Sequence, residues 1–213
     1  MRTLAVARFV AADVLRSQRW LLPLLALGAV LAVLYGGDPG AAPGPWAVSA
    51  LVLYPVSAWF AVVVASAEAS EQRPVTVAAA GGFAPVAAGT LIVALLGAFA
   101  MAALPVLVPL VVGHHPYPLP VVLTGAFTHL ACAATGTGVG LLCARPVVVR
   151  IGWSFCLALT IVTITAVQSW LPPVGSAVQA IVAGGPPPIG EAVLGVVLAV
   201  GASALAWAVE RRR

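Results

Sequence analysis

The sequence predicts an all-α integral membrane protein with six transmembrane helices, an interfacial helix before them and both termini in the cytoplasm. Three observations predict this fold class. The 213 residues are 62% hydrophobic and 8% charged, with a mean hydropathy of +1.11, well above the values of soluble domains. Six apolar runs lie along the chain, most of them near the roughly 20 residues that a crossing needs. All ten basic residues are arginines, and they occupy only alternate gaps between the runs.

The arginine placement predicts the orientation. The arginines precede the first run (Arg2, Arg8, Arg16, Arg19), separate the second from the third (Arg73) and the fourth from the fifth (Arg145, Arg150), and follow the sixth (Arg211, Arg212, Arg213). Short arginine-rich segments stay on the cytoplasmic side during insertion. This topology also explains the basic charge, so we expect no nucleic-acid binding. A composition without lysine and rich in alanine, glycine and proline indicates GC-rich codons, which favours a bacterial inner membrane as the location.

Residues 1–19 are too charged to cross a membrane. Leu4, Phe9, Val10, Val14 and Leu15 interleave with the four arginines of this segment at roughly helical spacing. The pattern predicts an amphipathic helix in the cytoplasmic interface, with its apolar side chains at the acyl boundary. The alternative is an ordinary flanking segment with no further role.

Residues 20–213 then form the predicted transmembrane domain. The third run carries Pro105 and Pro109, which remove helical hydrogen bonds and should kink or split its outer half. Gly136 and Gly140 of the fourth run, four residues apart, permit close packing of helices. The six runs are Trp20–Tyr35, Trp46–Ala67, Val86–Val112, Leu119–Ala144, Ile151–Trp170 and Ile189–Val209.

The segments predicted on the outer side are of two kinds. Gly36–Pro45 and Gly113–Pro118 are short and rich in glycine and proline, which is typical of turns. Residues 171–190 instead enclose the apolar stretch Val174–Ala183, which is too short to span a membrane and too hydrophobic for a loop in water. We expect a re-entrant or interfacial helix there.

The inner loop at residues 68–85 is the strongest local signal for a partner. Glu68, Glu71 and Arg73 gather there in a chain that is otherwise nearly uncharged, and a proline and a run of small residues follow. The loop is longer than a turn requires, so we expect a short cytoplasmic helix that contacts another protein. The alternative is a plain connection whose charges only solvate it.

Polar residues inside the runs define a possible substrate path. His129 lies within the fourth run, where an ionisable residue is a candidate functional group. A neutral imidazole that is hydrogen-bonded to a neighbouring helix is the competing interpretation, and hydroxyl groups in such runs more often bond to helix backbone or bridge helices. The residues of the possible path are Thr128, His129, Thr163 and Gln168.

No catalytic or metal-binding constellation is recognised. A phosphate-binding loop needs a lysine, which this chain lacks, so we expect no ATPase site of its own. Cys132, Cys143 and Cys156 have neither metal-site nor redox-pair spacing and are interpreted as small apolar fillers. The adjacent His114 and His115 have no carboxylates near them in sequence and are a weak indication of a metal site.

In these features the chain resembles the membrane subunits of type II (ABC-2-like) ABC exporters. The resemblance covers the whole length as an architecture, and its most specific piece is Glu71–Pro85, where an acidic residue, Thr76, small residues and a proline succeed one another. The family's usual basic, glycine and threonine pattern appears only loosely in this piece, where Gln72, Arg73 and Pro74 lie between the acidic residue and the small-residue run.

The resemblance implies a permease, without enzymatic activity of its own, that exports a hydrophobic or amphipathic substrate. It also implies a dimer with a second permease subunit, identical or not, and separate ATP-binding subunits that hold ATP and magnesium. These subunits would dock on the loop at Glu68, Glu71, Arg73 and Thr76.

Two other classes are compatible with the residues. A six-span substrate-capture subunit or small secondary carrier would have a similar topology, although carriers tend to have charged or broken mid-span sites and here only His129 is ionisable at depth. A membrane-embedded enzyme would need nucleophile, base or metal groups that converge within the spans.

Overall fold

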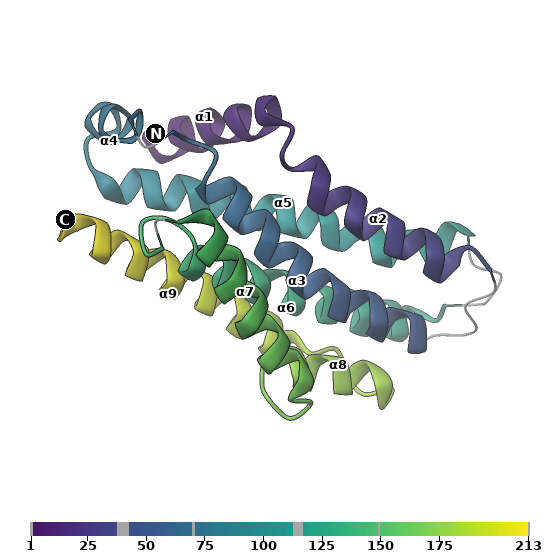
Figure 1. Ribbon diagram of the computed structural model, residues 1–213. Coiled ribbons are helices and arrows are strands. Elements are labelled where there is room, and N and C mark those ends of the chain that lie inside the picture. The colour runs from purple at the N-terminus through teal and green to yellow at the C-terminus, as the bar shows by residue number, and fades with distance from the viewer. Residues whose placement is uncertain (1, 38–42, 70, 113–116, 149, 213) are drawn as a thin grey trace.

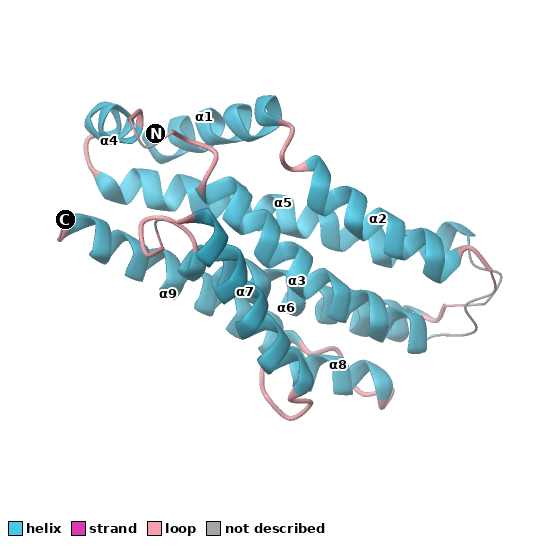
Figure 2. Ribbon diagram, viewed as in Figure 1, coloured by secondary structure: helices cyan, strands magenta, loops and turns pink. Residues whose placement is uncertain are grey.

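The computed structural model describes residues 2–37, 43–69, 71–112, 117–148 and 150–212. Within these ranges the chain forms nine helices and no strand (Figure 2), which confirms the all-α fold class. The long helices lie side by side in one bundle (Figure 1). The helices are α1 (Arg2–Ser17), α2 (Leu21–Tyr35), α3 (Gly44–Ala65), α4 (Arg73–Ala80), α5 (Phe83–Val112), α6 (Leu119–Cys143), α7 (Ile151–Val167), α8 (Val174–Val182) and α9 (Ile189–Arg211).

Helix length and composition give four or five candidate membrane spans, where the sequence predicted six. α3, α5, α6 and α9 are long and apolar enough, and α1 with α2 forms a fifth candidate as one pair bent by 68°. α2 has 15 residues and α7 has 17, which correspond to roughly 22 and 26 Å at the helical rise. Both fall short of a hydrocarbon core of about 30 Å. α7 ends early because Gln168 adopts an extended backbone, with φ −87° and ψ 90°.

α5 is one continuous helix of 30 residues. Of the kink or split expected at Pro105 and Pro109, the split therefore does not occur. Both prolines are buried in the bundle. Proline is tolerated within membrane helices where neighbouring helices and small local adjustments satisfy the carbonyl groups that it leaves unbonded. The inner side of α5 presents Ala94, Ala98 and Ala102, all nearly inaccessible.

α1 is amphipathic and packs along α5. Val6, Val10 and Val14 form its buried side, while Leu4 and Leu15 stay exposed. A Cβ at Gly89 of α5 would lie 2.8 Å from a methyl group of Val6, so this glycine lets α1 approach closely. A bend of 68° separates α1 from α2 in direction. α1 therefore packs on the bundle through its valines, while its leucines remain as exposed apolar surface.

α6 lies between α3 and α9 and makes its most extensive contacts with them. A Cβ at Gly140 would meet the Ala58 carbonyl oxygen and lie 2.7 Å from the Ala61 Cβ, so a glycine is needed where α6 crosses α3. On the α9 side, a Cβ at Gly138 would lie 3.1 Å from the Ala199 nitrogen. Because Gly140 and Gly138 lack side chains on the two sides of α6, they set the spacing of α3, α6 and α9.

Residues 171–190 contain the short helix that the sequence predicted there, α8. It packs against α6 at the end of the bundle opposite the chain termini (Figure 1). The Thr128 hydroxyl donates to the Ala177 carbonyl oxygen at 3.1 Å, and the Thr124 hydroxyl donates to the Gly185 carbonyl oxygen at 3.1 Å. These two hydroxyl groups hold α8 and the turn after it against α6.

We expect Gly140→Val to lower the stability of the bundle, because the new side chain must push α6 away from Ala58 and Ala61. Overpacking of this kind costs about 1–3 kcal/mol. Thermal unfolding in detergent, followed by loss of the monodisperse peak in size exclusion, measures the effect. The matched control is Gly28→Val, since a Cβ at Gly28 of α2 would have nothing within 4 Å. Equal melting temperatures for both variants would show that the glycine contact does not limit the packing.

Candidate functional site

The charged residues of the inner loop lie at the end of the bundle that also holds both chain termini. α4, the start of α1 and the end of α9 come together there (Figure 1). α4 begins at Arg73 with Pro74 in its first turn, a position in which proline needs no amide hydrogen. Gly81 caps its C-terminal end with a φ of 78°, in the left-handed region. The amides of Gly81 and Gly82 donate to the Ala78 and Val77 carbonyl groups. The loop thus contains a defined helix of eight residues.

An ion pair joins α4 to the last helix. The Arg73 guanidinium donates to both carboxylate oxygens of Glu210 in α9, and the Nη2 to Oε2 distance is 2.9 Å. Arg73 Nη1 also lies 3.5 Å from Glu68 Oε2, and the Thr76 hydroxyl donates to the Glu68 carboxylate. The Arg73, Glu68 and Glu210 side chains are 22%, 8% and 12% exposed, so water screens the network only in part. Two acidic groups therefore hold one arginine from opposite sides.

The electrostatics keep Arg73 charged. Burial by itself lowers the pKa of Arg73, but the hydrogen bonds and charge of Glu210, together with the charge of Glu68, outweigh burial and place this pKa above its usual range. A two-pronged arginine–carboxylate contact is also more directional than a single hydrogen bond. The arrangement can carry a displacement of α4 to α9, because neither end of the contact can move without breaking two hydrogen bonds.

The predicted docking residues Glu68, Arg73 and Thr76 therefore belong to one network of bonds within the protein. Sequence reasoning missed their fourth member, Glu210, which lies 137 positions from Arg73 and immediately before the terminal arginines. The available signal was an acidic residue at the end of a predicted span, opposite in charge to the loop's one arginine.

Glu71, the fourth of the predicted docking residues, lies beside a groove that Arg73 does not line. It is exposed and lies on the rim of this groove of about 580 Å³ between α1 and α4. The Arg2 side chain lies over Gly81 at one end of this groove. Phe9 and Val75, exposed by 46% and 69%, contribute apolar surface. The groove is lined by Arg2, Ala5, Val6, Phe9, Glu71, Gln72, Val75, Thr76, Ala79 and Ala80.

His129 is bonded through both ring nitrogens. Nδ1 lies 2.7 Å from the Gly125 carbonyl oxygen and Nε2 lies 2.9 Å from Ser49 Oγ on α3. A carbonyl oxygen only accepts, so Nδ1 carries the proton and Nε2 accepts from the serine hydroxyl. Ring and hydroxyl are completely buried. The geometry supports the interpretation of His129 as a structural link between α3 and α6.

The four residues of the possible substrate path do not share a surface. Thr128 and His129 are fully buried, whereas Thr163 and Gln168 are exposed. The Thr128 hydroxyl is occupied by the Thr124 and Ala177 carbonyl oxygens, and Gln168 Oε1 accepts from the Trp170 indole at 3.0 Å. The structure brings together only the two neighbours on α6.

The described part of the chain contains no group of three or more histidine, cysteine or acidic residues that could hold a metal ion. Cys132 and Cys143 are buried and Cys156 is exposed. His114 and His115 lie outside the described residues. No protein-family model, no curated protein and no solved structure matches this chain. Any function must therefore be argued from the geometry and from the sequence pattern.

We expect Arg73 and Glu210 to be energetically coupled. In a double-mutant cycle of Arg73→Gln and Glu210→Gln, measured as unfolding free energy in detergent, the coupling should be about 1–3 kcal/mol, the range for hydrogen bonds to charged groups. The control cycle pairs Arg73→Gln with Glu191→Gln, since Glu191 lies in the first turn of α9, at its other end. Additive effects for Arg73 and Glu210 would contradict a working contact between α4 and α9.

Proposed function

We propose that this chain is the membrane-spanning permease subunit of an ATP-driven exporter of the ABC-2-like type. The observation that carries the proposal is the Arg73–Glu210 contact, which ties a short helix outside the bundle to the last long helix. A permease without an ATPase site must receive movement from a separate ATP-binding subunit. When that subunit displaces α4, the two charge-assisted hydrogen bonds between Arg73 and Glu210 transmit the displacement to α9.

The outer surface of α4 and α1 supports the same proposal. Glu71, Phe9 and Val75 lie around one groove, which combines exposed apolar area with charge at its rim. Interfaces between subunits commonly have an apolar centre and a polar rim. In this proposal the ATP-binding subunit docks at Glu71, Phe9 and Val75. Glu68, Arg73 and Thr76 transmit its motion to the bundle. ATP and magnesium belong to the partner.

The proposal includes six spans with both termini in the cytoplasm of a bacterial inner membrane. α2 and α7 would be the short spans, and a locally thinned bilayer or snorkelling of flanking residues accommodates such a mismatch at modest cost. Arg16 and Arg19 flank the start of α2, and Arg145 and Arg150 flank the start of α7. A second permease subunit would complete a substrate path for a hydrophobic or amphipathic molecule.

The orientation predicts opposite labelling at the two ends of the bundle. In a variant with its three cysteines replaced by alanine, Asp38→Cys should react with an impermeant thiol reagent added to intact cells, because the arginines place it outside. Gln72→Cys, at the exposed start of α4, should react only after the membrane is opened. The reverse pattern would invert the topology and remove the docking surface from the cytoplasm.

We expect Val75→Arg to weaken docking of the ATP-binding protein encoded beside this chain's gene. Co-purification should fall about tenfold or more, since an unpaired charge buried in an interface costs more than the roughly 1.4 kcal/mol that a tenfold change represents. Val112→Arg, at the opposite end of α5 and 53% exposed, is the matched control. If the Val75→Arg variant co-purifies with its partner as well as the unaltered protein does, the loop is only a connection. If the neighbouring gene does not encode an ATP-binding protein, the exporter proposal is weakened.

A further inference from the structure

A small cavity lies beside the contact between Arg73 and Glu210. It measures about 20 Å³, which is roughly the space of one water molecule. Its walls come from the ends of α3, α6 and α9, from the start of α5 and from the connection after α6. The charged side chains of its lining are those of Arg73, Arg145 and Glu210. A second arginine therefore shares this cavity with the ion pair.

Arg145 reaches the cavity from a different loop than Arg73 does. Arg145 lies in the connection between α6 and α7, whereas Arg73 begins α4. Glu210 is the one acidic residue in the described lining of the cavity. Arg73 is also held on its other side by Glu68. One carboxylate at the end of α9 thus lies beside cations from two separate loops.

Two hydroxyl groups make the wall of the cavity polar. The Thr90 hydroxyl donates to the Val86 carbonyl oxygen at 3.0 Å, and the Ser203 hydroxyl donates to the Ala87 carbonyl oxygen at 3.3 Å. Each hydroxyl uses its hydrogen in this bond and keeps lone pairs that can accept from a guanidinium group. A guanidinium group that turns within the cavity therefore meets oxygen acceptors as well as apolar surface.

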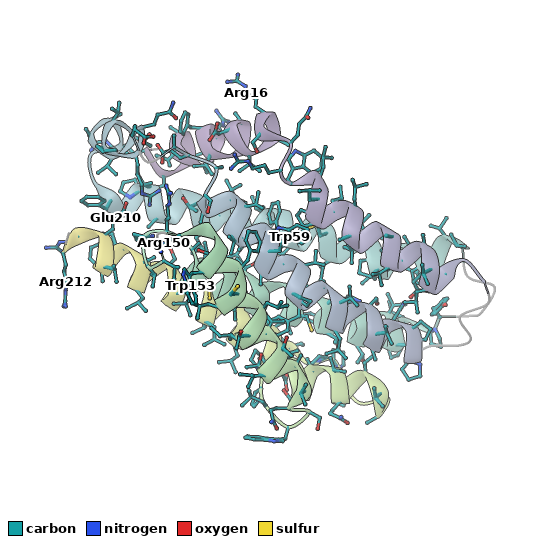
Figure 3. All side chains as sticks on the ribbon, viewed as in Figure 1. Arg16, Trp59, Arg150, Trp153, Glu210 and Arg212 are labelled. Atoms are coloured by element: carbon teal, nitrogen blue, oxygen red, sulfur yellow. The ribbon has the colours of Figure 1, made fainter. Side chains whose placement is uncertain are left out.

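The arginines that follow Glu210 in the sequence have other surroundings. The Arg211 guanidinium carbon lies 5.4 Å from the centre of the Trp207 ring. Figure 3 shows Arg212 at the free end of α9, beyond Glu210. Neither arginine lines the cavity. Within the described part of the chain, Arg145 is therefore the further cation that shares a cavity with the Arg73–Glu210 contact.

We propose that Glu210 exchanges Arg73 for Arg145 when α4 moves away from the bundle. The Glu210 side chain is 12% exposed, and a carboxylate this far from water is costly to leave unpaired. Arg145 remains charged and presents the same planar group of donors as Arg73. The α4 loop and the α6–α7 connection then hold α9 alternately. That a partner displaces α4 rests on the proposed function, whereas the exchange itself needs only this chain.

The energetic coupling between Arg145 and Glu210 tests the exchange. A double-mutant cycle of Arg145→Gln and Glu210→Gln is measured on the full-length protein in detergent, as the equilibrium constant for unfolding. The cycle is run once in the unaltered background and once with Arg73→Gln. We expect the coupling factor to be about tenfold larger with Arg73→Gln, because the charged hydrogen bonds to Arg145 form when Arg73 is removed. No ATP-binding subunit is present, so a failure of the exchange would leave the proposed docking untested and intact.

The matched control cycle replaces Arg145→Gln with Arg211→Gln, because Arg211 adjoins Glu210 in the sequence without lining the cavity. Its coupling to Glu210 should change less than about twofold between the two backgrounds. If Arg73→Gln prevents folding, Arg73→Lys takes its place, since lysine keeps the charge and loses the two-pronged contact. The Arg145 coupling should rise there as well. An Arg145 coupling that is equal in the two backgrounds, or that rises no more than the Arg211 coupling, overturns the exchange.

Discussion

The close packing of α6 with α3 and α9 is the constraint on which the rest of the fold depends. Between apolar helices in a lipid environment there is little hydrophobic driving force, so association relies on van der Waals contact and on backbones that approach closely. Gly140 faces Ala58 and Ala61 of α3, and Gly138 faces Ala199 of α9. Because these contacts fix the centre of the bundle, α5 can be added through its alanine face and α8 through the hydroxyl groups of α6.

The polar groups of the interior are mostly used to hold helices rather than to form a path. Thr135 and Thr137 donate to carbonyl oxygens one turn back on α6, and His129 is saturated by Gly125 and Ser49. An unpaired polar group in an apolar medium costs several kcal/mol. The two threonines avoid that cost within α6, and His129 avoids it within α6 and across to α3. These bonded groups therefore do not form a polar path through a single copy of this chain.

Charged side chains are concentrated at the end of the bundle that holds the chain termini, where they occur in two different arrangements. At α4, Arg73 is enclosed by Glu68 and Glu210 and connects helices that are distant in sequence. At the corner between α1 and α2, Arg16 and Arg19 are exposed and have no acidic partner among the described residues. The first arrangement suits transmission of motion within the protein, and the second leaves two positive charges at the surface.

The sequence by itself determined the helical class, the positions of most helices and the existence of α4 and α8, because apolar run length and proline and glycine placement are local signals. It also indicated the close approach at Gly136 and Gly140. Of the kink or split expected in α5, the split does not occur, and the sequence could not determine the partners of Arg73. Those depend on where α9 passes: only the tertiary structure brings Glu210, 137 residues away, against Arg73, and turns a predicted docking residue into an internal link. The close contact of the Phe60 ring with Gly97 likewise appears only in the tertiary structure, since no local pattern records how two separate helices meet.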